Sequence, residues 1–324
     1  MIYNVYHKTA FEYQSNVTFS HNLARLKPKV TSYQKLLAFT MEVSPTPFES
    51  FEYLDMFGNT NTHMLIREPH QSLSVIGKST VEVLPDIIDE HVNSIKTNST
   101  TYGDALKRLS KFNMNDLYAK QYLFESELIP YGSLKIKEYA LMSFQENRDV
   151  FEAANEFMTR IFNDFEFLSG FSDITTPVEQ IFEAKKGVCQ DFAQFAISAL
   201  RTIGLPTKYM SGYIETLPAE GQKKLFGTDA SHAWFAVYIP NAGWMEFDPT
   251  NNIIPREQHI LLGSGRDYND ISPLKGVVFS SGNSNLSVMV DVRKEELISE
   301  KTIAQEESQI KIITTQEQNQ SQSQ

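Results

Sequence analysis

The chain of 324 residues is long enough for two domains, or for one large domain with an appendage. Its hydrophobic content of 41% and charged content of 21% are typical of a soluble globular protein with a sizeable core. The formal net charge of -11 argues against nucleic acid as the main partner, because neutralising phosphates requires a basic patch. A single cysteine excludes an intramolecular disulfide and a cysteine-rich zinc site. With neither a run of about 18 apolar residues nor a secretory signal pattern, the sequence predicts a cytoplasmic protein without a membrane partner.

Residues 1–90 are predicted to form a β-rich domain. Apolar residues alternate with polar ones between turn formers, most clearly in the strand expected at 36–43. Residues 55–59 are predicted to be a turn between strands, because Gly58 and Asn59 can adopt positive φ. Several short strands of this kind indicate an antiparallel sandwich or barrel. The histidines of this domain follow no metal-binding spacing, so no metal site is expected.

Residues 91–170 are predicted to be a helical connector. Helical periodicity is clearest at 149–162, where apolar residues at three- and four-residue spacing form one face. The members of this face are Val150, Phe151, Ala154, Phe157, Met158, Ile161 and Phe162. We expect them to pack in the core.

Residues 171–293 are predicted to be the catalytic core, and residues 294–324 a polar tail. Near the end of the core, 276–279 and 286–292 are expected to pair with one another as closing strands. The tail is rich in Glu, Gln and Ser and lacks the apolar residues that a packed structure needs. We therefore expect it to be flexible.

Cys189 is the candidate nucleophile. A helix that begins near 176–179 is expected to end at Gly187, and a second helix is expected from 188 or 189 to 203. The unpaired N–H groups and the positive end of the dipole in its first turn favour a thiolate over a thiol. The same N–H groups can stabilise the oxyanion that forms when the thiolate attacks a carbonyl.

His232 and Asp248 lie in two predicted strands that form a hairpin, at 232–239 and 244–248. Alternation places each side chain on a defined face of its strand. If the connecting loop has an odd number of residues, the two faces coincide, and an even number separates them. With an odd loop, His232 takes the proton of Cys189 and Asp248 orients the imidazole and supports its charge.

Four motifs together resemble the core of the bacterial transglutaminase-like superfamily. They are Gly-Val-Cys-Gln-Asp-Phe-Ala at 187–193, Leu-Pro-Thr-Lys-Tyr-Met-Ser-Gly-Tyr at 205–213, Ser-His-Ala-Trp at 231–234 and Gly-Trp-Met-Glu-Phe-Asp-Pro-Thr at 243–250. The resemblance implies an α+β fold with a papain-like core, in which a helix carrying Cys packs on an antiparallel sheet carrying His and Asp. It also implies a triad of Cys189, His232 and Asp248. The first 90 residues resemble the β-rich N-terminal region of such bacterial proteins.

The residues around the triad are weaker candidates for substrate contacts. Gln190 and Asp191 adjoin the nucleophile, but neighbouring helix positions point apart, so at most one faces the cleft. Trp234 is expected to pack and to shield the Cys-His pair, and Tyr209 and Tyr213 either line the site or pack in the sheet. Neither a cofactor nor a calcium loop is indicated.

The predicted function is that of a cysteine protease or amidase that cleaves an amide through a thioacyl intermediate in a protein or peptide substrate. Water is always present as an acceptor, and no feature marks a dedicated amine site. Two alternatives stay open. One is a protein-glutamine gamma-glutamyltransferase, which shares the thioacyl intermediate, and the other is a non-catalytic peptide-binding module on the same fold. The sequence does not indicate an oligomeric state.

Overall fold

The computed structural model describes residues 1–216, 224–227, 229–279 and 283–295. Met1–Arg293 forms one compact unit, and Lys294–Gln324 forms a second. The predicted tail therefore lies outside the described residues, apart from its first two. Among the described residues, no helix is both long and apolar enough to cross a bilayer.

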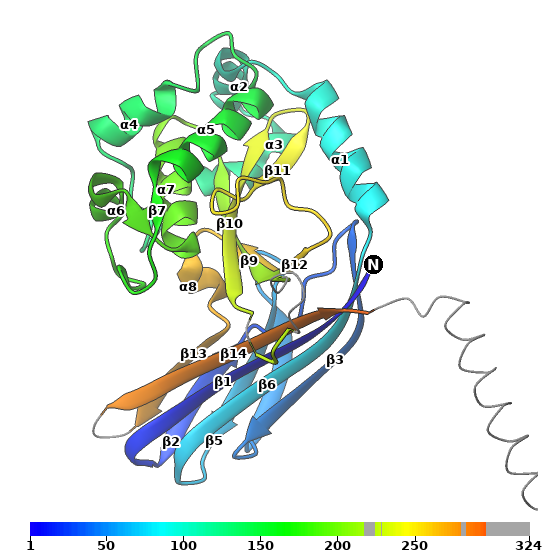
Figure 1. Cartoon of the computed structure of the whole chain (residues 1–324), viewed down its shortest axis with the longest axis vertical. Helices are drawn as coiled ribbons and strands as arrows, with labels where there is room; N and C mark the ends of the chain where they lie inside the picture. Colours follow the sequence, from blue (N-terminus) through cyan, green and yellow to red (C-terminus); the bar gives the residue numbers. More distant parts are fainter. Residues whose placement is uncertain (217–223, 228, 280–282, 296–324) are drawn as a thin grey trace, which may run out of the picture. The chain divides into compact units, whose positions relative to one another are not determined.

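The β-rich N-terminal region consists of two four-stranded antiparallel sheets (Figure 1). Their orders are β14-β1-β6-β3 and β13-β2-β5-β4. The strands are β1 (Ile2–Val17), β2 (Phe19–Ala24), β3 (Gln34–Ser44), β4 (Glu49–Leu54), β5 (Thr60–Ile66), β6 (His70–Val83), β13 (Leu274–Phe279) and β14 (Ser284–Lys294). Met64 and Ile66 of one sheet share an apolar cluster with Leu73 and Val75 of the other. This packing of two sheets confirms the predicted β-rich region.

The two closing strands do not pair with each other, and that prediction was wrong. β13 pairs with β2, and β14 lies beside β1, so both return to the N-terminal sheets. Alternation of apolar residues identifies a strand and its buried face, but it does not identify the partner strand.

The helices lie between β6 and the sheet of the core, except for α8, which follows that sheet. They are α1 (Pro85–Asn98), α2 (Tyr102–Leu109), α3 (Met114–Lys120), the 3-10 helix η1 (Gln121–Leu123), α4 (Leu134–Leu141), α5 (Val150–Asp164), α6 (Val178–Ala184), α7 (Cys189–Thr202) and the short α8 (Tyr268–Ile271). α5 begins where the side chain of Asp149 accepts from the backbone N–H of Glu152. Its predicted apolar face is buried except for Phe162, which is 45% exposed.

A four-stranded antiparallel sheet in the order β11-β10-β9-β12 forms the second layer of the core. Its strands are β9 (Thr207–Ile214), β10 (Ser231–Ile239), β11 (Gly243–Phe247) and β12 (His259–Gly265). α7 lies against β10 (Figure 1), and Phe195 of the helix shares the buried core with Phe235 of the strand. A two-residue parallel pair, β7 (Glu166–Phe167) with β8 (Lys186–Gly187), precedes α7.

The hairpin of β10 and β11 has an odd loop, as the triad hypothesis required. Ile239 pairs with Gly243, which leaves three residues, 240–242, between them. Continuing this register places Asp248 opposite Trp234, two positions along the strand from His232. Because side chains alternate with a period of two, His232 and Asp248 share a face.

The free edge of β12 is covered by two side-chain amides of the N-terminal region. Gln34 donates to the carbonyl of Leu261 at 2.7 Å and accepts from its N–H at 2.7 Å. Asn59 donates to the carbonyl of Ser264 at 2.9 Å and accepts from its N–H at 3.0 Å. The two amides thus stand in for a neighbouring strand, which an edge strand would otherwise lack.

Candidate active site

Cys189 is the first residue of α7, and its neighbours fix where that helix begins. The backbone N–H of Val188 donates to Oδ2 of Asp191 at 2.7 Å, and the hydroxyl of Ser172 donates to the same oxygen. Burial raises the pKa of Asp191, while these two hydrogen bonds act against the shift. The thiol of Cys189 is half-buried and free. It therefore lies at the helix end where backbone N–H groups favour negative charge, as predicted.

Gly187 does not cap the preceding helix, so that prediction was wrong. α6 ends before Lys185, which adopts a left-handed φ of 54°. A Cβ on Gly187 would lie 2.7 Å from Oδ2 of Asp191 and 2.8 Å from its Cβ. Glycine is needed at 187 because the carboxylate that starts α7 occupies this space.

His232 is the second residue of β10, and its ring bonds both other members of the predicted triad. Nε2 of His232 lies 2.7 Å from Oδ2 of Asp248, and both side chains are buried. Since Nε2 is engaged there, Nδ1 is the ring nitrogen left for the thiol of Cys189. Burial disfavours the charged imidazole, but hydrogen bonds with Asp248 and Cys189 outweigh it and raise the pKa of His232. The structure thus brings the three side chains together in the order Cys–His–Asp.

Asp248 is held by donors on both of its oxygens. Oδ2 also accepts hydrogen bonds from Nε2 of His259 at 3.0 Å and from Nδ2 of Asn251 at 2.7 Å. Oδ1 accepts the backbone N–H groups of Thr250 at 3.0 Å and Asn251 at 3.3 Å. Burial acts to raise the pKa of Asp248, but the hydrogen bonds from His232 and His259 hold it well below its ordinary value. The carboxylate is therefore kept ionised and fixed in place.

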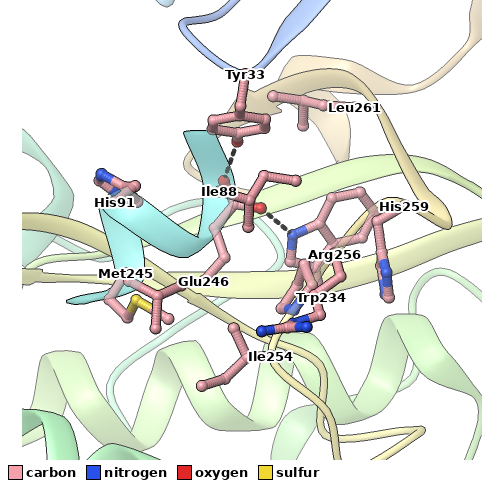
Figure 2. A pocket seen from close by; sticks show the side chains of 12 residues that line it. Tyr33, Ile88, His91, Trp234, Met245, Glu246, Ile254, Arg256, His259 and Leu261 are labelled. Carbon is pink, nitrogen blue, oxygen red and sulfur yellow. Dashed lines mark hydrogen bonds between the residues drawn. The ribbon is translucent and has the colours of Figure 1, made fainter. Parts of the chain in front are cut away.

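Trp234 lies beside His259 in the wall of a pocket (Figure 2). Its ring stacks on His232 with centroids 5.9 Å apart, and its Nε1 donates to Glu246 at 2.7 Å. Tyr33 of the N-terminal region donates to the other oxygen of Glu246. The pocket beyond this wall has a volume of about 30 Å³. That volume suits about one water molecule, so this pocket is too small for a peptide.

The other predicted site residues lie in different surroundings. Asp191 is buried and starts α7, while Gln190 beside it is half-buried. Tyr209 is buried, and burial with the nearby charge of Cys189 raises its pKa well above the ordinary value. Tyr213 turns to the N-terminal region, where its hydroxyl lies 3.0 Å from Nδ1 of His7. Of these four residues, Tyr213 serves the junction between the two regions.

His259 and Asn251 are neighbours of Asp248 that the sequence analysis did not identify. Asn251 follows Asp248 by three residues, and an aspartate that begins a turn often accepts from the backbone just after it, so a local signal existed. His259 carried no such signal. It reaches Asp248 only because β12 pairs with β9 and β9 pairs with β10.

Among the described residues, one cluster has the donors to hold a metal ion. It consists of His232, Asp248 and His259, whose ligand atoms all lie within 4.8 Å of one another. In the structure these atoms bond directly to each other through Oδ2 of Asp248.

A Cys-bearing helix on an antiparallel sheet that carries His and Asp, preceded by a β-rich region, defines the class of transglutaminase-like proteins. The family model for the bacterial transglutaminase-like N-terminal region matches residues 3–82. The model for the transglutaminase-like superfamily matches residues 139–249. The chain belongs to the transglutaminase-like superfamily.

Relatives and a solved structure extend this assignment over most of the chain. An uncharacterised protein of Mycobacterium tuberculosis is 33% identical over 298 residues, which is 90% of this chain and 92% of that one. A protein-glutamine gamma-glutamyltransferase of Pseudomonas aeruginosa is 32% identical over 104 residues, 29% of this chain and 15% of that one. A crystal structure from Cytophaga hutchinsonii named "Putative Cysteine Protease" has a TM-score of 0.67, with 19% identity and 92% of each chain covered. The last comparison shows a shared fold.

Proposed function

We propose that the protein is a cysteine protease or amidase that cleaves an amide bond of a protein or peptide through a thioacyl intermediate. The observation that carries the proposal is the hydrogen-bonded series from Cys189 through His232 to Asp248. A nucleophile, a base and an orienting acid in contact are the parts that covalent acyl transfer needs.

The first half of the proposed reaction breaks the amide. The thiolate of Cys189 attacks the carbonyl carbon, and the electron pair of the C=O bond moves to the oxygen, which accepts hydrogen bonds from N–H groups at the start of α7. His232 holds the proton that left the thiol. As the carbonyl re-forms, the C–N bond breaks and His232 gives this proton to the leaving nitrogen.

The second half releases the acyl group. His232 takes a proton from water, and the resulting hydroxide attacks the thioester carbon. The C–S bond breaks, the carboxylic acid leaves, and the thiol is restored. Asp248 keeps the imidazole in one orientation throughout and stabilises its positive charge.

The second candidate is a transglutaminase, in which a primary amine replaces water. It is favoured by the 32% sequence identity, over 104 residues, with the gamma-glutamyltransferase of Pseudomonas aeruginosa. The fold shared with the protein from Cytophaga hutchinsonii, which is named "Putative Cysteine Protease", supports hydrolysis instead. We also propose the cytoplasm as the location, because a reducing compartment keeps the lone thiol free.

The test offers a library of peptide amides to the purified protein, with and without a primary amine, and identifies products by mass. We expect hydrolysis that is lost in Cys189→Ala, while the control Asp104→Asn, at an exposed ion pair with Lys107, keeps it. Amine incorporation exceeding hydrolysis would replace our proposal with the transferase. If the wild type processes no peptide and Cys189 alkylates no faster than free cysteine, the chain is a binding module.

A further inference from the structure

A second histidine shares the oxygen that orients the first. His259, the first residue of β12, is buried, and its Nε2 lies 3.0 Å from Oδ2 of Asp248. His232 bonds the same oxygen at 2.7 Å. Nδ1 of His259 is buried and has no hydrogen-bond partner in the described part of the chain. The ring is therefore engaged through one nitrogen, and that nitrogen faces Asp248.

The ring of His259 is fixed by contacts other than Asp248. The indole of Trp234 meets it edge to face, with centroids 5.3 Å apart and an interplanar angle of 79°. The backbone N–H of His259 donates to the carbonyl of Arg256 at 3.0 Å. Two residues along the strand, Leu261 is held by Gln34. His259 thus approaches Asp248 from a rigid strand, whereas Asn251 approaches it from the turn that Asp248 itself begins.

We propose that His259 is a positioning residue for the triad: its Nε2–H holds Oδ2 of Asp248 where that oxygen accepts from His232. This inference rests on the proposed function of the site. A carboxylate can rotate about its Cβ–Cγ bond, and Asn251 and Thr250 restrain it only from its own turn. The donor from β12 fixes the oxygen from the other side. Small displacements of a catalytic group cost up to about 100-fold in rate, so such a restraint matters.

The same three side chains form a possible metal-ligand set, but their surroundings favour hydrogen bonding. Metal-bound histidines normally donate their second N–H to an acceptor. Nδ1 of His259 has no such acceptor among the described residues, and Nδ1 of His232 is left for the thiol of Cys189. The amide nitrogen of Asn251 also donates to Oδ2 of Asp248 at 2.7 Å.

The test compares His259→Gln, which keeps an N–H donor at a similar reach, with His259→Leu, which fills the space without one. The rate of Cys189 alkylation by iodoacetamide is measured from pH 5 to 10, and peptide hydrolysis is measured separately. For His259→Leu we expect alkylation at pH 6 to slow at least tenfold. The alkylation rate of this variant should approach that of a free thiol. His259→Gln should restore most of the rate.

The readouts separate this inference from the proposed function. Alkylation reports the Cys–His–Asp arrangement even if no amide substrate is cleaved, so absent hydrolysis with a His259-dependent profile overturns the function alone. Thermal unfolding confirms that both variants are folded. Wild-type profiles in both folded variants would overturn the positioning role. Zinc bound stoichiometrically to the wild type and lost in His259→Leu would also overturn it, because the cluster would then be a metal site.

Discussion

Asp248 is the residue at which the contacts of the site converge. Its Oδ2 accepts hydrogen bonds from the side chains of His232, His259 and Asn251. Its Oδ1 accepts hydrogen bonds from two backbone N–H groups. Three donors on one oxygen are tolerable only while that oxygen carries negative charge. The same contacts lower the pKa of Asp248 and give it a fixed position.

Replacing Asp248 with Asn tests the importance of this charge. The amide has the same shape, but its oxygen is neutral and accepts weaker hydrogen bonds from the two histidines. Its N–H can also donate to His232, which then adopts the wrong tautomer. We expect peptide hydrolysis to fall about 10⁴-fold, as for the same change in a serine triad. The control Asp104→Asn removes only an exposed ion pair with Lys107, so its rate should match the wild type. A loss under tenfold in Asp248→Asn would contradict this role.

Lys185 is an unusual cation four residues before the nucleophile. Its ammonium lies 3.7 Å from the ring centroid of Phe182, 4.3 Å from Phe165 and 4.4 Å from Tyr139. Its Nζ is buried without a hydrogen-bond partner in the described residues. Desolvation outweighs other effects and lowers the pKa of Lys185 to about 8.

This lowered pKa predicts how stability depends on pH. Between pH 8 and about 10.4, the unfolded chain keeps a proton that the folded chain has released. Because the unfolded state binds more protons, the free energy of unfolding rises with pH in this window. Urea titrations at pH 7.5, 8.5 and 9.5 should show wild type gaining stability relative to Lys185→Met. The exposed neighbour Lys186 supplies the control Lys186→Met, for which no such gain is expected. Parallel curves for wild type and Lys185→Met would refute the prediction.

At the scale of elements, β12 is the strand on which the two regions meet. It carries His259 toward the triad, and it takes Gln34 and Asn59 as its neighbours along one edge. A Cβ on Gly263 would lie 2.8 Å from Oδ1 of Asn59, so the strand needs glycine there for the amide to approach. Asn59 therefore serves as a hydrogen-bonding partner of β12, while the positive φ of the 55–59 turn falls on Gly58.

Truncating Gln34 should weaken this edge. In Gln34→Ala, the N–H of Leu261 loses its partner, while its C=O keeps only the backbone N–H of Lys29. The unpaired N–H should cost about 1–3 kcal/mol of unfolding free energy. The measurement is urea denaturation. Lys35→Ala is the matched control, because Lys35 forms only an exposed ion pair with Glu82 and should change stability by at most about 1 kcal/mol. Equal midpoints for the two variants would show that the amide contributes nothing to holding β12.

At the scale of the whole molecule, residues from both ends of the described chain build the N-terminal sheets. β13 and β14 come after the core and pair with β2 and β1. His7 of β1 also bonds Tyr213 of β9 within the core. The β-rich region and the core therefore depend on each other.

Removing the N-terminal region should prevent the core from folding alone. A chain that begins at Pro85 leaves β13 and β14 without partners and exposes the edge of β12, which promotes aggregation. We expect it to lack the near-ultraviolet circular dichroism of the full chain and to elute as aggregates. A shorter chain over 85–273, which lacks both closing strands, should fail as well, because β12 stays uncovered. A cooperative thermal transition in either chain would contradict this expectation.

The sequence alone determined the parts of this protein that depend on local order. Spacing located the start of α7 at 188 or 189, and a side-chain period of two placed His232 and Asp248 on one face for an odd loop. The composition and turns of residues 1–90 indicated a β-rich region. Each of these features follows from residues within a few positions of each other, or from a repeat along one element.

Only the tertiary structure decided the features that join distant segments. The partners of β13 and β14, the amide cover on β12 and the contact of His259 with Asp248 depend on which strands lie side by side. No local pattern encodes that choice, because a buried strand reads the same whichever neighbour it has. The sequence therefore identified Cys189, His232 and Asp248 as candidates. The odd loop that brings His232 and Asp248 to one face, and the residues that hold them in place, came from the tertiary structure.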